Sequence, residues 1–258
     1  MKANEILRLY DEHERRNASF PNYRREEDGS VVRLVDLSGN HSLVSHSDLG
    51  PDDADAAIER ELAYFKELGK PFEWKLFSHD EPADLSDRLA ARGFSLGDEE
   101  AIMALDLSES PEGLGSAAGS DVRRVIDEAG FLDYAAVNEQ AWPDSAHDGG
   151  WLAGVKATIL GDPERMSAYV AYADGVPVCA SRIEFPEHSP FASLWGGATL
   201  EPYRKRGIYT AMLSVRAREA AARGYRFLTI DASPMSRPIA AKHGFQLLCI
   251  SRPCDSPR

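Results

Sequence analysis

The most informative segment of this 258-residue chain is Ala198-Thr199-Leu200-Glu201-Pro202-Tyr203-Arg204-Lys205-Arg206-Gly207-Ile208-Tyr209-Thr210-Ala211-Met212-Leu213. It begins as an apolar strand, passes through a turn with three consecutive basic residues and a glycine, and continues as an amphipathic helix. The first-turn amides of a helix lack intrahelical acceptors, and the helix dipole adds about half a positive charge there. Glycine permits close approach of the backbone, and basic side chains add hydrogen-bond donors. The segment therefore predicts a site for a phosphate ester.

The pattern around this segment occurs twice in the chain. A shift of 151 residues places Asp80 on Asp231 and Gly93-Phe94 on Gly244-Phe245. Both copies read as strand, helix, strand, helix and strand, and in both the first helix has apolar residues at i, i+4 and i+7 spacing and a closing glycine. Such a repeated unit predicts an α/β protein built from two related mixed-sheet domains with helices on both faces, the first of them shortened.

The two copies are separated by a segment without apolar periodicity, residues 108–120, which is typical of a linker. We therefore expect a first domain over residues 1–110 and a second over residues 120–258. The second domain has additional predicted elements before the basic turn: a strand, a helix, and a hairpin around Asp174-Gly175.

At the basic turn the sequence resembles the GNAT superfamily of acyl-CoA-dependent N-acyltransferases. The family motif is Arg or Gln, two residues, Gly, one residue, then Gly or Ala, between a strand and a helix. This chain has Arg204-Lys205-Arg206-Gly207-Ile208-Tyr209, with a bulky Tyr209 in the last position. The later segment from Ser233 to Phe245 is similar to the family's second motif, a helix followed by Gly-Phe.

The resemblance implies acetyl-CoA as the acyl donor and one cofactor site, in the second half. The first half has Pro51-Asp52-Asp53-Ala54-Asp55-Ala56 in the equivalent turn, where carboxylates would repel a diphosphate. The strand end implied to face the pantetheine arm is Ala198, Thr199 and Leu200. The residues implied to hold the diphosphate are Arg204, Lys205, Arg206, Gly207, Ile208, Tyr209 and Thr210.

The resemblance leaves the proton-transfer groups open. Family members often carry a tyrosine acid four residues before the Gly of the second motif, and this chain has Ala240 there. An amine nucleophile must lose a proton, so a base is required near the strand. Glu184 is the candidate catalytic residue, followed by Glu187, His188 and Asp231; for each, a surface ion pair or helix cap is the competing interpretation. The loop 142–151 either receives a cationic amine between its two tryptophans and two aspartates, or is an apolar anchor with solvated charges.

Composition narrows the classes of partner. The chain is 43% hydrophobic and 28% charged, which is typical of a globular protein, and its net charge of −13 disfavours nucleic acid and anionic membranes. Residues 201–258 nevertheless carry 11 basic and 4 acidic residues, so a phosphorylated cofactor is not disfavoured there. Three cysteines without ligand spacing predict neither a disulfide framework nor a metal site. With no apolar leader or membrane-length run, we expect a cytoplasmic protein.

The resemblance implies an N-acetyltransferase that moves an acetyl group from acetyl-CoA to an amine of a small molecule or peptide, by direct attack on the thioester. Two alternatives remain. A non-catalytic acyl-CoA-binding module or sensor would explain Ala240, and an interaction domain would need no nucleotide ligand. The sequence predicts neither the acceptor amine nor the oligomeric state.

Overall fold

The structure is a computed structural model that describes residues 1–20, 22–37, 39, 41–109, 121–143 and 149–257. The chain divides into two compact units. Unit 1 comprises residues 1–103, 232–238 and 246–258, and unit 2 comprises residues 104–231 and 239–245. The sequence predicted one boundary between residues 110 and 120, most of which lies outside the described residues. The structure differs at the end of the chain, because the last strand pairs within unit 1.

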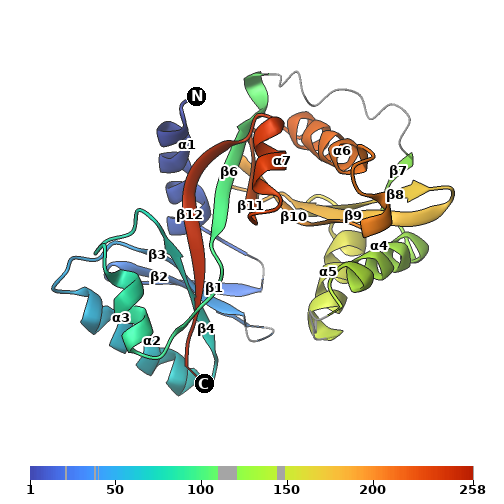
Figure 1. The fold of residues 1–258 in the computed structure, drawn as a ribbon. Helices are drawn as coiled ribbons and strands as arrows, with labels where there is room; N and C mark the ends of the chain where they lie inside the picture. Colours follow the sequence, from blue (N-terminus) through green and yellow to red (C-terminus); the bar gives the residue numbers. More distant parts are fainter. Residues whose placement is uncertain (21, 38, 40, 110–120, 144–148, 258) are drawn as a thin grey trace. The chain divides into compact units, whose positions relative to one another are not determined.

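Unit 1 contains a mixed sheet in the order β1-β2-β3-β4-β12, in which β3 and β4 are parallel and the other neighbours are antiparallel. Figure 1 shows α1 and η1 on one face of this sheet and α2 and α3 on the other. Its elements are α1 (Ala3–Tyr10), the π-helix η1 (Asp11–Arg16), β1 (Tyr23–Asp28), β2 (Val31–Asp36), β3 (Ser42–Ser47), α2 (Ala54–Leu68), β4 (Phe72–Phe77), α3 (Leu85–Ala91), β5 (Ser95–Leu96) and β12 (Gln246–Asp255). The unit boundary falls inside β6 (Glu100–Asp106).

The core of unit 1 follows from the apolar pattern of α2 and β4. Ile58 and Phe65 on α2 are buried against Trp74 on β4 and Leu89 on α3. Burying an apolar side chain of this size stabilises the fold by roughly 1.5–3 kcal/mol. The helix ends where predicted, because Gly69 takes the left-handed conformation (φ 65°) at its C-terminus.

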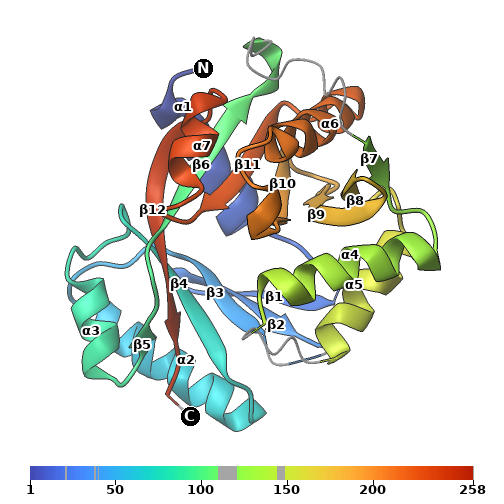
Figure 2. The same cartoon turned by 45° about the vertical axis from the view of Figure 1, so that its right-hand side comes forward.

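Unit 2 contains the sheet strands β7-β8-β9-β10-β11, in this order, and among these neighbours only β10 and β11 are parallel. The helices α4 and α5 lie on one face of this sheet and α6 on the other in both views (Figures 1 and 2). The elements are η2 (Leu107–Glu109), β7 (Asp121–Arg124), α4 (Glu128–Ala141), α5 (Gly149–Gly161), β8 (Met166–Ala173), β9 (Val176–Glu184), β10 (Phe191–Thr199), η3 (Glu201–Tyr203), α6 (Ile208–Ala222), β11 (Phe227–Ala232) and α7 (Arg237–Lys242).

The predicted hairpin is present: β8 and β9 are joined at Asp174 (φ 52°) and Gly175 (φ 78°), the left-handed pair that a tight hairpin turn requires.

The internal repeat is visible in the backbone. The unit β3-α2-β4-α3 of unit 1 corresponds in element order to β10-α6-β11-α7. Gly93 and Gly244 have the same φ of 86°, and the amides of Phe94 and Phe245 each bond a carbonyl five residues earlier at 3.2 Å. The predicted α/β class with mixed strand pairing is confirmed.

Candidate functional site

The basic turn lies between β10 and α6, as predicted, and its side chains fold back onto the turn itself. Arg204 Nε donates to the carbonyl of Thr199 at 3.0 Å, and Arg206 Nη2 donates to the carbonyl of Pro202 at 3.0 Å. Among the described residues, Arg204, Lys205 and Arg206 are exposed and make no ion pair with a carboxylate. The turn therefore presents three uncompensated positive charges beside a helix N-terminus.

The backbone of this turn suits an anion. Lys205 has φ 62° and Gly207 has φ 79°, so two residues of the turn are left-handed. For a non-glycine residue this conformation costs on the order of 1 kcal/mol, and such strain is concentrated at functional sites. Gly207 is the N-cap of α6 and supplies no capping side chain, and the first turn contains no acidic residue. The first-turn amides of Ile208, Tyr209 and Thr210 are thus left for an outside acceptor.

Tyr209, the residue that departs from the family motif, packs toward β10. Its Cε2 lies 3.4 Å from the position that a Cβ on Gly197 would take. The ring therefore occupies the space over a glycine of the neighbouring strand, and the Tyr209 amide stays within the first turn. The bulky side chain is compatible with the predicted site for this reason.

The strand beside the turn separates from its parallel neighbour. β10 pairs with β11 from Phe191 to Leu194, whereas β10 continues to Thr199 and β11 to Ala232. A bulge between Trp195 and Ala198 shifts the register with β9 at the same place. In the described structure, the β11-facing backbone groups of residues 195–199 thus take no part in that parallel ladder. Ala198, Thr199 and Leu200, the residues implied to face a pantetheine arm, lie at this end.

Glu184 lies on the α4 face of the sheet, away from the basic turn. Its Oε1 accepts a hydrogen bond from Arg182 Nε at 3.0 Å, and its side chain is 24% exposed. Glu184 pairs with Ser193 on β10, five residues before Ala198, which is about 16 Å along a strand. The candidate base therefore pairs with the first half of β10, whereas the diphosphate candidates follow the C-terminal end of this strand.

Three polar side-chain tips surround the first bulge glycine, Gly196 (φ 57°). A Cβ there would lie 3.1 Å from Arg182 Nη1, 3.7 Å from Tyr134 Oη and 3.8 Å from Asn138 Oδ1. Tyr134 Oη is buried and interacts with the guanidinium of Arg182. No sequence pattern singles out Arg182 or Tyr134, because their proximity depends on how α4 packs on β9.

The other candidate residues are less central. Glu187 and His188 are exposed in the β9–β10 turn, and Asp231 is half-buried on β11, one residue after the last rung of the β10–β11 ladder. Ala240 is buried, 2% exposed, at the position where the family has its tyrosine. Of the loop 142–151, residues 144–148 lie outside the described residues.

In unit 1 the equivalent turn is closed by ion pairs. Asp55, in the first turn of α2, lies 3.2 Å from both Arg88 Nη1 and Arg92 Nη2, and Arg92 Nε also donates to Glu59 at 2.9 Å. Carboxylates at a helix N-terminus satisfy the dipole from within the chain. This first turn is therefore unsuited to a diphosphate, unlike that of α6.

The strand separation of unit 1 is filled by Arg15. β3 and β4 pair only from Ser42 to Val44 on β3, and Arg15 Nε donates to the carbonyl of Ser45, the next residue, at 3.4 Å. The guanidinium also contacts Asp80 and His79 beyond the end of β4. Arg15 is 2% exposed, so unit 1 occupies with its own side chain the place that corresponds to the β10–β11 separation.

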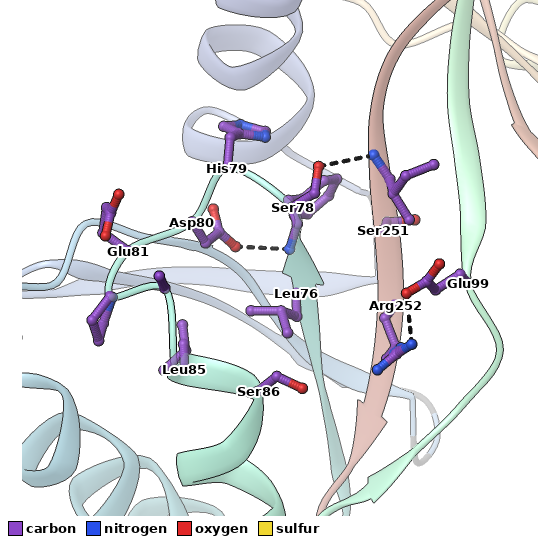
Figure 3. A pocket seen from close by; sticks show the side chains of 14 residues that line it. Leu76, Ser78, His79, Asp80, Glu81, Leu85, Ser86, Glu99, Ser251 and Arg252 are labelled. Carbon is purple, nitrogen blue, oxygen red and sulfur yellow. Dashed lines mark hydrogen bonds and ion pairs between the residues drawn. The ribbon is translucent and has the colours of Figure 1, made fainter.

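A pocket of about 260 Å³ lies in unit 1, and none of the predicted site residues lines it. Figure 3 shows His79 and Glu81 on one side of it and Glu99 with Arg252 on the other. Its charged groups are largely paired already: Asp80 with Arg15, and Glu99 with Arg252 at 2.6 Å. The pocket thus offers little uncompensated charge to a ligand.

Three further observations limit the chemistry of the described residues. They contain no cluster of three or more His, Cys, Asp or Glu side chains arranged for a metal ion. None of their helices is long and apolar enough to cross a membrane. Cys179, Cys249 and Cys254 are buried and are not joined to one another by a disulfide, and burial raises the pKa of the Cys179 thiol.

Comparison with solved structures supports the fold. A GCN5-related N-acetyltransferase from Kribbella flavida matches 99% of this chain and 96% of its own with a TM-score of 0.69 and 16% identity. A tandem GNAT protein from the clavulanic acid biosynthesis pathway matches 92% of this chain and 84% of its own with a TM-score of 0.61 and 12% identity. A GCN5-related N-acetyltransferase from Sphaerobacter thermophilus covers 88% and 76%, with a TM-score of 0.62 and 14% identity.

At these identities the likeness establishes the fold, which is that of GCN5-related N-acetyltransferases, and confirms the fold-level resemblance. Comparison of the sequence with protein-family models gives no match, and comparison with curated proteins gives none either.

Proposed function

We propose that unit 2 binds acetyl-CoA at the β10–α6 turn and catalyses acetyl transfer to an amine of a small molecule or peptide. The observation that carries the proposal is the contrast between the two copies. The first turn of α6 has a glycine cap, no acid and three unpaired cations beside it, whereas the first turn of α2 is neutralised by Arg88 and Arg92. Unit 1 is proposed to bind no cofactor.

The residues fit the parts of an acyl-CoA. The first-turn amides and the hydroxyl of Thr210 would hold the diphosphate, while Arg204, Lys205 and Arg206 would attract it. The backbone of residues 195–199 would bind the amide groups of the pantetheine arm, because it takes no part in the ladder with β11. When bound, acetyl-CoA supplies the thioester whose carbonyl carbon is attacked.

The transfer needs one base and one proton donor. The amine nitrogen forms a C–N bond to the acetyl carbon, the C–S bond breaks, and the CoA thiolate takes up a proton. Glu184 is proposed to accept the proton of the amine, with Arg182 fixing its carboxylate. The buried cysteines are unsuited to form an acyl-enzyme, which favours direct attack on the thioester.

Release of CoA thiol from acetyl-CoA in the presence of a library of amines tests the activity, and calorimetric titration with CoA tests the site. The double variant Arg206→Glu with Gly207→Asp is expected to abolish CoA binding, whereas Arg218→Glu, an exposed change on α6, retains it. Undiminished CoA binding by the double variant would show that the site is elsewhere.

A second function is favoured by Ala240, which offers no proton to the departing thiolate. If the purified chain binds acetyl-CoA and gains thermal stability, yet transfers the acetyl group to no amine, it is an acyl-CoA-binding module or sensor.

A further inference from the structure

A histidine outside every predicted set contacts the diphosphate candidates. His243, which directly follows α7, has its Nε2 3.2 Å from Oγ1 of Thr210. Thr210 is the third residue of α6, so its hydroxyl lies at the same helix end as the first-turn amides. The imidazole is therefore in direct contact with the side chain that would meet a diphosphate.

The internal repeat shows that this contact belongs to the fold. The shift of 151 residues places Arg92 on His243, and each residue precedes a glycine with φ 86°. In unit 1 the side chain at this position also reaches the first turn of the preceding helix, where Arg92 Nη2 meets Asp55. The residue at this position of the repeat therefore contacts the first turn of a helix in both units. In unit 1 the Arg92 guanidinium contacts the Asp55 carboxylate, and in unit 2 the His243 imidazole contacts the Thr210 hydroxyl.

The buried nitrogen of the ring determines which atom carries the proton. His243 Nδ1 is buried and has no hydrogen-bond partner among the described residues. A buried N–H without an acceptor loses its hydrogen bond to water, so a proton on Nδ1 is disfavoured. In the neutral tautomer with its proton on Nε2, the single N–H of the ring donates to Thr210 Oγ1.

The direction of this hydrogen bond matters for the threonine. When Oγ1 accepts from His243, the hydroxyl proton of Thr210 remains available to another acceptor. An anion bound at this helix N-terminus, which the dipole and three exposed cations favour, would be such an acceptor. A phosphate oxygen there would receive a donor already oriented by the imidazole.

We propose that His243 is a positioning residue that holds the Thr210 hydroxyl as a hydrogen-bond donor to the diphosphate of acyl-CoA. This inference rests on the proposed function of the β10–α6 turn. It adds a residue from the second motif to a site that the first motif alone defined.

Calorimetric titration of the full chain with two ligands tests it: acetyl-CoA, and S-acetylpantetheine, which has the same thioester arm but no diphosphate. Thr210→Val is expected to weaken acetyl-CoA binding about tenfold, and His243→Leu about fivefold, from the usual range for a hydrogen bond to a charged group. The double variant should bind no more weakly than Thr210→Val. His243→Gln, whose side-chain amide can donate from the place of Nε2, should bind within about twofold of the wild type.

The control ligand and control variant separate positioning from folding. S-acetylpantetheine should bind all variants equally, and Thr210→Ser, which keeps the hydroxyl, should resemble the wild type. Additive losses in the double variant, or equal losses for both ligands, would overturn the role of His243 while leaving the site intact. A wild-type chain that does not bind acetyl-CoA would overturn the site and this inference together.

Discussion

Arg15 and Asp80 form a buried ion pair in unit 1: Arg15 Nη2 lies 2.5 Å from Asp80 Oδ1, and the two side chains are only 2% and 3% exposed. The other oxygen of Asp80 accepts from the amide of Phe77, and Arg15 also contacts Asp11. Both charges are therefore satisfied within the fold, at the place where β3 and β4 separate. Arg15 thus fills the separation between β3 and β4 in unit 1, whereas we propose that the separation between β10 and β11 in unit 2 receives the pantetheine arm.

Removing the cation of this buried pair should lower the free energy of unfolding more than removing one partner of an exposed ion pair. Arg15→Leu leaves the Asp80 carboxylate buried without its partner, so the free energy of unfolding is expected to fall by about 3–5 kcal/mol. Urea denaturation followed by circular dichroism measures the change. Glu27→Gln removes an exposed partner of Arg25 and should cost less than about 1 kcal/mol. Equal losses in the two variants would contradict the assignment of Arg15 as a buried structural residue.

The repeat explains why much of the fold could be predicted. Gly93-Phe94 and Gly244-Phe245 follow helix ends at which the glycine takes the left-handed conformation. This preference belongs to glycine itself and can therefore be recognised in the sequence. Asp80 and Asp231 match only in the sequence shift, because Asp80 lies beyond the end of β4 whereas Asp231 lies within β11. The partner of Asp80 could not be predicted, because Arg15 lies 65 residues away along the chain. Arg15 also lies in a π-helix, and no residue pattern marks that helix in the sequence. The return of β12 to unit 1 was missed likewise, since pairing partners are not local.

The two bulge glycines of β10 should respond differently to alanine. Gly196 has φ 57°, and a Cβ there would lie 3.1 Å from Arg182 Nη1, so Gly196→Ala is expected to cost about 1–3 kcal/mol. Gly197→Ala meets only an ordinary contact of 3.4 Å with Tyr209 and should cost less than about 1 kcal/mol. Thermal and urea denaturation of the two variants measure the difference. If the order is reversed, the bulge geometry is not as described.

The basic turn was predictable where the bulge was not. Arg204 to Gly207 are consecutive, and their chemistry depends on one strand and one helix that the pattern itself predicts. The cluster of Arg182, Tyr134 and Gly196 needs the packing of α4 on β9, which no spacing encodes. His243 had a signal that could have found it, since it stands at the position of Arg92 in the repeat.

His46 makes the stability of unit 1 depend on pH. Burial, and then the charges of Arg15 and Arg16, lower the pKa of His46, although Asp80 and Asp11 act in the opposite direction. The folded chain thus resists a proton that the unfolded chain accepts below its ordinary value near 6.5. Stability is therefore highest above pH 6.5 and falls as the pH decreases through the lowered pKa of the folded state.

His46→Gln should flatten this part of the profile. The melting temperature of the wild type is expected to drop between pH 7 and pH 5, and the variant should drop less over the same range. His41→Gln, at an exposed histidine, serves as the control and should follow the wild type. A variant profile parallel to that of the wild type would show that other groups cause the acid sensitivity.

The three cysteines should resist alkylation in the folded protein. Cys179, Cys249 and Cys254 are 1%, 6% and 0% exposed, and burial raises the pKa of Cys254 to about 12. Because the thiolate is the reactive form, iodoacetamide at pH 8 is expected to modify none of them until the chain is unfolded. Mass spectrometry counts the adducts before and after addition of guanidinium chloride. A folded-state adduct on Cys179 would reopen the question of an acyl-enzyme.

Glu184→Gln should separate the chemical step from cofactor binding. Glutamine keeps the size and one acceptor for Arg182 but cannot take a proton, so kcat with a responsive amine is expected to fall by about 10²- to 10⁴-fold. Binding of acetyl-CoA should stay unchanged, because Glu184 lies five residues along the sheet from Ala198. Glu187→Gln, at an exposed turn, should keep the wild-type kcat. Equal rates for Glu184→Gln and wild type would assign the proton to another group, of which Asp231 at the end of the β10–β11 ladder is the next to test.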